Sequence, residues 1–129
     1  MKIYKIAQNK LYLDSETLDD RIRIYLKNNN DIVGKLTLQF NLDDKRYILT
    51  YFQLEDQYQK QGWGTKMFEE LLKLYDGGKP ILVQPLPFLD DDVDQQIQSL
   101  KSFYLKLGFR EYEKYPSWMI YGQDKNENI

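Results

Sequence analysis

A strand, a helix opened by glycines and a second strand follow one another in the middle of this 129-residue chain. The run "YILTYFQL" (47–54) is almost continuously hydrophobic, which predicts a central strand covered on both faces. From Gly64 to Tyr75 hydrophobic residues recur at helical spacing, and "KPILVQP" (79–85) indicates a short buried strand. This order predicts a right-handed parallel β-α-β unit, with the glycines at its first turn.

The segments before this unit predict antiparallel strands. "RIRIYLKN" (21–28) and "DIVGKLTLQF" (31–40) are rich in β-forming residues and flank a polar turn, which predicts a hairpin. A helix over 18–26 is the alternative, but Ile24 would then lie off its hydrophobic stripe. Residues 7–20 have room for one short helix at most. The whole therefore belongs to the mixed α/β (α+β) class.

The last third of the chain predicts a second helix and a closing strand pair. Hydrophobic residues at helical spacing mark a helix over 90–107. Gly108 is expected to end it in the left-handed C′ position, followed by the hydrophobic Phe109 that accompanies such a cap. Two short segments around Pro116 then form an antiparallel pair. We expect the tail, from about 123 to 129, to be frayed.

Composition limits the chemistry that this chain can perform. It has neither Cys nor His, which excludes a thiolate nucleophile, a disulfide, a Ser-His pair and an imidazole ligand for zinc. Acid, base and nucleophile roles therefore fall to Asp, Glu, Tyr, Lys, Ser or Thr, and we expect no metal site.

Charge and hydropathy indicate the class of protein and its surroundings. Eighteen Lys and Arg against twenty Asp and Glu give a net charge of −2, which offers no basic surplus for nucleic acid. No secretory signal and no long hydrophobic span is found, so we expect a cytoplasmic protein without a membrane partner. The length and the 42% hydrophobic content predict one domain over residues 1–129.

The glycine turn matches neither common nucleotide-binding pattern. A P-loop requires four residues between its glycines, whereas Trp63 alone separates Gly62 from Gly64. A dinucleotide fingerprint requires a third glycine where Met67 stands. The P-loop pattern fails and the dinucleotide match is weak, and a nucleotide-binding domain that uses the same glycine turn stays a more distant alternative.

The same turn still has the physical properties of an anion site. Unpaired N–H groups at a helix start carry a partial positive charge, and glycines let an anion approach the backbone. Lys60 and Lys66 would add charge at the rim. The alternative is that Gly62 and Gly64 only permit a tight strand-to-helix turn. Spacing alone leaves both interpretations open.

Two motifs together carry a resemblance to a known family. Gln59 precedes Gly62 by three residues and gives Q-x-x-G-x-G, and "FYLKLGF" (103–109) follows about forty residues later. They resemble, in order, the Q/R-x-x-G-x-G/A pyrophosphate loop and the F-Y-x-K-x-G-F signature of the GNAT superfamily of N-acetyltransferases. The resemblance covers 21–121. It implies the GNAT fold, in which a mixed central sheet is splayed between strands 47–54 and 80–84.

The resemblance also implies a cosubstrate, acetyl-CoA, and the residues that bind it. The pantetheine arm would lie in the gap between the two splayed strands, bonded to the backbone of Phe52 and Leu54. The pyrophosphate would meet the glycine loop, which comprises Gln59, Lys60, Gln61, Gly62, Trp63, Gly64 and Thr65. Trp63 is a variable position in the family, and packing under the loop is the alternative to cofactor contact.

The resemblance assigns an acid more directly than a base. Tyr104 matches the tyrosine that protonates the departing CoA thiolate. The alternative is a core tyrosine on the helix face. The glutamate that some members carry on the central strand would fall at Ile48, so it is absent. Glu55 is the candidate base, with Asp56 beside it, but both also fit a turn, and proton loss through ordered water is the other route.

The implied activity is transfer of an acetyl group from acetyl-CoA to an amine by direct attack in a ternary complex. The alternative is a catalytically degenerate CoA-binding or interaction module of the same fold. The acceptor would be a small-molecule or peptide amine. Asp90 to Asp94 could attract a cationic acceptor, or could only cap a helix. The short N-terminal part implies an acceptor side that is open or completed by a second subunit, in a monomer or a homodimer.

Overall fold

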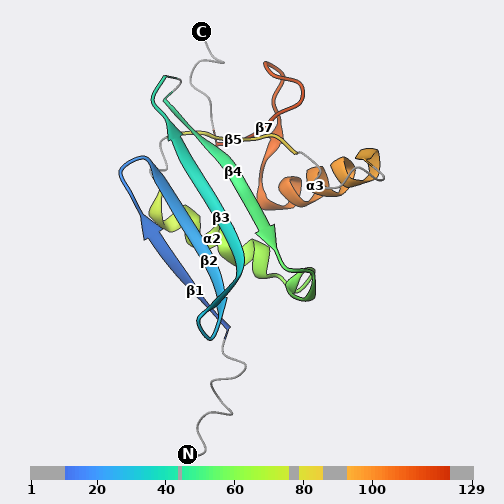
Figure 1. Ribbon diagram of the computed structural model, residues 1–129. Coiled ribbons are helices and arrows are strands. Elements are labelled where there is room, and N and C mark those ends of the chain that lie inside the picture. The colour runs from blue at the N-terminus through green and yellow to red at the C-terminus, as the bar shows by residue number, and fades with distance from the viewer. Residues whose placement is uncertain (1–10, 44, 76–78, 86–92, 123–129) are drawn as a thin grey trace, which may run out of the picture. The chain divides into compact units, whose positions relative to one another are not determined.

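The computed structural model describes residues 11–43, 45–75, 79–85 and 93–122 (Figure 1). Its elements are β1 (Leu11–Thr17), β2 (Arg21–Asn28), β3 (Asp31–Asn41), β4 (Arg46–Leu54), the short 3₁₀ helix η1 (Asp56–Tyr58), α2 (Trp63–Leu74), β5 (Ile81–Val83), α3 (Val93–Leu107), β6 (Arg110–Glu111) and β7 (Met119–Tyr121). The strands are hydrogen-bonded in the order β1-β2-β3-β4-β5-β7-β6. This mixed sheet with two α-helices confirms the predicted fold class.

The chain divides into two compact units, and one division between them in the sequence falls within β4. Unit 1 comprises Met1–Phe40 and Thr50–Tyr75, and unit 2 comprises Asn41–Leu49 and Asp76–Ile129. The candidate glycine loop and α2 belong to unit 1, whereas α3 and the closing strands belong to unit 2. The single-domain expectation stays a prediction.

In unit 1, α2 covers one face of the antiparallel strands (Figure 1). Burial alternates along β2, with Ile22, Ile24 and Leu26 inward. Met67 and Phe68 of α2 are also buried. Each large side chain buried in this way stabilises the unit by roughly 1.5–3 kcal/mol. The predicted hairpin is confirmed, and the helix over 18–26 is excluded.

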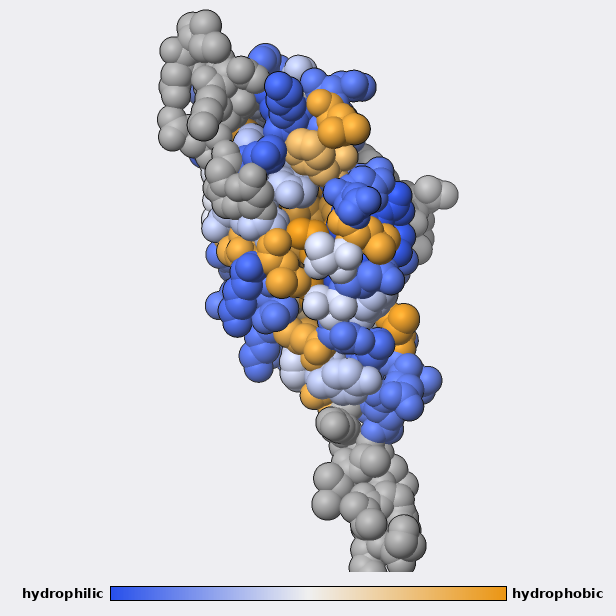
Figure 2. Space-filling view, turned by 90° about the vertical axis from the view of Figure 1, so that its left-hand side faces the viewer, coloured by the Kyte–Doolittle hydropathy of each residue, from blue (hydrophilic) through white to orange (hydrophobic). Residues whose placement is uncertain are grey.

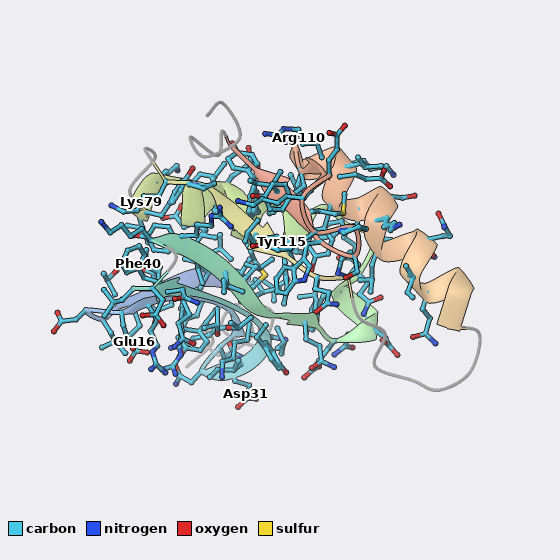
Figure 3. The ribbon with its side chains drawn as sticks, turned by 90° about the horizontal axis from the view of Figure 1, so that it is seen from above. Glu16, Asp31, Phe40, Lys79, Arg110 and Tyr115 are labelled. Carbon is cyan, nitrogen blue, oxygen red and sulfur yellow. The ribbon has the colours of Figure 1, made fainter. Side chains whose placement is uncertain are left out.

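The sequence leaves room for one short helix at most in residues 7–20. Leu11–Thr17 is instead an edge strand that pairs antiparallel with β2. Lys27 Nζ lies 2.8 Å from Asp14 Oδ2. Arg23 Nη1 lies 3.0 Å from Oε1 of Glu16, the residue labelled in Figure 3. These cross-strand ion pairs, with the sheet hydrogen bonds, favour the extended form over any local helical preference.

Unit 2 contains the parallel strand pair and the second helix. Tyr47 and Ile48 of β4 pair in parallel with β5, which confirms the predicted pairing, and β5 pairs antiparallel with β7. The β6–β7 pair is also antiparallel, as expected.

Within the described ranges, no helix is long and hydrophobic enough to cross a bilayer. Figure 2 shows hydrophilic and hydrophobic side chains interspersed over one side of the molecule.

α3 ends as the sequence predicts. Gly108 has a φ of 108°, and its N–H donates to Leu105 O at 3.1 Å while the Phe109 N–H donates to Tyr104 O at 3.0 Å. This pair of bonds is the Schellman arrangement. The Phe109 and Tyr104 rings meet edge to face, with centroids 5.4 Å apart.

β4 departs from the predicted strand in one respect. We expected cover on both faces, but Thr50, Tyr51 and Gln53 are exposed. The consecutive exposure of Thr50 and Tyr51 breaks the alternation of a regular strand. We infer an irregularity of the bulge type near Thr50 and Tyr51, which exposes part of this hydrophobic segment to solvent.

The backbone hydrogen bonds of β4 show the same break. Tyr47 donates to Pro80 O beside β5, whereas Glu55, an even number of residues later, donates to Val33 O in β3. Residues an even number apart in a regular strand face the same neighbour. Because the Glu55 N–H faces β3, the carbonyl of the same peptide, Leu54 C=O, points away from β3.

Replacement of Gly108 by alanine tests the cap of α3. Its φ is strained for any L side chain, and a Cβ there would lie 3.0 Å from Tyr121 Cε2. We expect Gly108→Ala to lower the free energy of unfolding by about 1–3 kcal/mol. Urea unfolding measures this loss, with Ser102→Ala at an exposed α3 position as control. Equal stability of Gly108→Ala and the wild type would contradict the cap geometry.

Candidate functional site

The first turn of α2 presents backbone donors without a side-chain cap. Gly62 is the N-cap residue, with a φ of 89°, and no side chain of the described residues caps this end. The first intrahelical bond runs from the Lys66 N–H to Gly62 O at 3.1 Å. The N–H groups of Trp63, Gly64 and Thr65 precede this bond, and the first turn contains no acidic residue. The arrangement favours an anion.

The β4–α2 loop, residues 55–62, shapes the approach to these donors. Lys60 and Gly62 both have positive φ, at 60° and 89°, whereas Gln61 between them does not. Alternation of this kind turns successive N–H groups toward one concave side. A Cβ added at Gly62 would meet no atom within 4 Å. Glycine is therefore favoured at this position by the backbone conformation, and the space beside it is open.

Side-chain hydrogen bonds hold this loop in place. Gln59 Nε2 donates to Leu54 O at 2.7 Å, and Gln61 Nε2 donates to Gln57 O at 2.7 Å. Asn28 Nδ2 donates to the Tyr58 hydroxyl at 2.9 Å. The contact between Asn28 and Tyr58 cannot be predicted from the sequence because the two residues are far apart in the chain and neither carries a local signal.

Basic and aromatic side chains lie beside the helix start. Lys66 Nζ is 4.6 Å from the centre of the Trp63 ring, and Trp63 is half-buried. Lys60 and Thr65 are exposed. The structure thus brings the predicted loop residues together in unit 1, while their contact with a cofactor stays a prediction.

The end of β4, where the pantetheine contacts are predicted, extends beyond its pairing with β5. Pairing with β5 involves Tyr47 and Ile48, although β4 continues to Leu54. Phe52 and Leu54 are half-buried. A Cβ at Gly34 would lie 2.6 Å from Leu54 Cδ1, so this glycine lets the Leu54 side chain pack closely on β3.

Tyr104, in unit 2, has a buried ring. It is 6% exposed, and its ring contacts Phe103 and Phe109. Burial raises the pKa of Tyr104 to about 12. The hydroxyl is protonated at neutral pH, as that of an ordinary tyrosine also is, and its role as an acid stays a prediction. The core position that we considered as the alternative role is compatible with this chemistry.

The candidate base has no specialised surroundings in the described residues. Glu55 is exposed, and its Oε1 accepts a hydrogen bond from Gln57 Nε2 at 3.2 Å. Asp56 Oδ1 accepts from Gln59 Nε2. The acidic stretch Asp90 to Asp94 lies outside the residues whose side chains are described. No group of three or more acidic residues that could hold a metal occurs in the described ranges.

The raised pKa of Tyr104 predicts a specific pH dependence of stability. An unfolded tyrosine loses its proton near pH 10, whereas Tyr104 keeps it up to about 12 in the folded state. Between these values the unfolded state binds fewer protons, so stability falls as pH rises. The difference in unfolding free energy between wild type and Tyr104→Phe should shrink by about 2–3 kcal/mol over this range. Urea unfolding from about pH 9 upward measures it, and a constant difference would contradict the burial of the hydroxyl.

No protein-family model matches the sequence, and no curated protein matches it either. Solved structures do match. The PaiA N-acetyltransferase of Thermoplasma acidophilum, solved with coenzyme A, has a TM-score of 0.60 and 17% identity over 81% of this chain and 62% of its own. A GNAT-family acetyltransferase of Staphylococcus aureus Mu50 has a TM-score of 0.57 and 17% identity over 78% and 66%.

A third match is a streptothricin acetyltransferase of Bacillus anthracis, solved with acetyl coenzyme A. It has a TM-score of 0.59 and 13% identity over 92% of this chain and 86% of its own. This chain therefore spans less than two thirds of the first two proteins and most of the third. At these identities the likeness concerns architecture: the chain has the fold of the GNAT acetyltransferases.

Proposed function

We propose that this protein is an N-acetyltransferase that moves an acetyl group from acetyl-CoA to an amine by direct attack in a ternary complex. The observation that carries the proposal is the uncapped start of α2, which has no acidic residue in its first turn and open space beside Gly62. Its place after β4 in this fold supports CoA as the anion, because proteins of the same fold have been solved with coenzyme A and acetyl coenzyme A.

The residues of unit 1 fit the parts of CoA in chain order. The N–H groups of Trp63, Gly64 and Thr65 would bind the pyrophosphate, and each such contact is worth about 0.3–2 kcal/mol. Lys60 and Lys66 would add positive charge near it. The edge of β4 that faces away from β3 would bond the amides of the pantetheine arm.

Tyr104 is the proposed acid. The amine nitrogen attacks the thioester carbonyl carbon, the carbon–sulfur bond breaks, and the departing CoA thiolate takes the Tyr104 proton. The Tyr104 hydroxyl is protonated at neutral pH, and its raised pKa of about 12 makes it a weaker acid than an ordinary tyrosine. The proton released by the amine passes to Glu55 or to ordered water.

The acceptor is a small-molecule or peptide amine in this proposal. The protein acts in the cytoplasm, as a monomer or homodimer, without a nucleic-acid or membrane partner. One observation favours the second candidate, a CoA-binding module without turnover: β4 carries no Asp or Glu along its whole length. Direct attack with proton loss to water does not require such a residue.

A charge placed in the first turn of α2 tests the anion site. Thr65 is exposed, so Thr65→Glu should leave the ligand-free protein as stable as the wild type, because an acid at a helix start is favourable. The same carboxylate would repel the pyrophosphate, and we expect CoA to bind at least about tenfold more weakly. Thermal shift against CoA concentration measures both effects.

Thr65→Gln is the control for size without charge and should bind CoA nearly as well as the wild type. Saturating CoA or acetyl-CoA, at about 100 times the dissociation constant, should stabilise the wild type by about 2.7 kcal/mol. Absence of any shift with either compound would contradict the proposed function, and a shift with ATP alone would reassign the site to a nucleotide.

Removal of the Tyr104 hydroxyl tests the acid. Tyr104→Phe should lower kcat by about 10²- to 10⁴-fold while the thermal shift with CoA stays the same. Release of free CoA thiol from acetyl-CoA, measured over a panel of amines, gives the rate. Wild-type protein that binds CoA but turns over none of the amines would support the binding module, and an undiminished rate in Tyr104→Phe would exclude Tyr104 as the acid.

A further inference from the structure

The amide of Gln59 uses its donor nitrogen within the loop. Gln59 Nε2 donates to Leu54 O at 2.7 Å and to Asp56 Oδ1 at 3.2 Å. A glutamine amide nitrogen has two hydrogens, so both are engaged. The opposite orientation of the amide would place its oxygen against two other acceptors, which excludes it. The remaining Oε1 is an acceptor and is unsuited to a phosphate oxygen.

These bonds join the end of β4 to the loop that follows it. The Glu55 N–H donates to Val33 O at 2.9 Å, and the C=O of the same peptide, that of Leu54, accepts from Gln59. The last peptide of β4 is therefore fixed from both sides. The loop and the small η1 helix that follow β4 are visible in green in Figure 1.

The residue after Gln59 has an unfavourable backbone conformation. Lys60 has a φ of 60°, which costs a non-glycine residue roughly 1–2 kcal/mol. Such a conformation persists where neighbouring contacts impose it. Gln59 supplies a contact on one side of Lys60, and Gln61 supplies one on the other through Gln57 O. Without the Gln59 hydrogen bonds, Lys60 could leave its positive φ. The N–H groups of the loop would then no longer point to one common side.

We propose that Gln59 is a positioning residue: its amide ties the loop to the Leu54 carbonyl and so aligns the donors at the start of α2, without touching the pyrophosphate. The identity of the bound anion rests on the proposed function, whereas the alignment of the loop does not.

Hydrogen exchange of the ligand-free protein tests this role. The amides of Glu55, Gln59 and Lys66 donate the bonds that border the loop. In Gln59→Ala we expect them to exchange about three- to tenfold faster, the factor for one lost hydrogen bond of this kind. CoA should bind more weakly by a similar factor, because a smaller fraction of the protein has the competent loop.

Gln57→Ala is the matched control, since Gln57 is an exposed glutamine of the same loop whose amide donates only to the Glu55 carboxylate among the described residues. It should change neither exchange nor affinity. Unchanged amide exchange rates in Gln59→Ala would overturn the proposal, whether or not the affinity for CoA falls. A lower affinity for CoA with unchanged exchange rates would indicate that Gln59 contacts the ligand directly. Faster exchange in a protein whose wild type binds no CoA would support the positioning role and contradict the proposed function.

Gln59→Glu gives an independent test with the same side-chain length. At about pH 7.5 its carboxylate would face two acceptors, and the exchange rates of the ligand-free protein should rise at least as much as in Gln59→Ala. Protonation toward about pH 4, below the ordinary glutamate pKa of about 4.3, restores one donor, so exchange relative to the wild type at the same pH should slow again. A ratio independent of pH would overturn the proposal.

Discussion

The packing of α2 against the unit 1 sheet is the interaction on which the candidate site depends. Met67, Phe68 and Leu71 are almost completely buried, and a Cβ at Gly34 would lie 3.5 Å from Met67 Sδ. Because a helix is rigid, burial of these side chains also fixes the direction of its first N–H groups. Burial of each such side chain stabilises the unit by roughly 1.5–3 kcal/mol, and together they supply more free energy than an exposed loop could by itself.

The loop adds precision to what the helix packing provides. β4 ends with its last peptide bonded on both sides, and Gly62 then supplies the left-handed turn into α2. An anion would meet donors that are already aligned, and a site ordered before binding avoids the entropic cost of ordering it afterwards. This reasoning explains how a chain with net charge −2 can offer a site for a highly charged cosubstrate without a basic cluster.

Much of the fold follows from local patterns in the sequence. Alternation predicts β2 and β3, helical spacing predicts α2, and Gly108 with Phe109 predicts the end of α3. The strand Leu11–Thr17 was not predicted because its pairing depends on ion pairs with β2, which local spacing cannot show. The exposed face of β4 was missed because an almost continuous hydrophobic run hides an irregularity at Thr50 and Tyr51. The motif indicates Gln59, but its hydrogen-bond partner is a main-chain carbonyl, which cannot be identified from residue type.

The central claim is that the backbone at the start of α2 binds the pyrophosphate of CoA, and an amide-resolved NMR titration tests it most directly. With CoA, the largest shifts should fall on the amides of Gly62, Trp63, Gly64 and Thr65. Pantetheine, which lacks the pyrophosphate, should leave these amides unchanged. Equal shifts with both compounds, or CoA shifts that leave the start of α2 unaffected, would contradict the account.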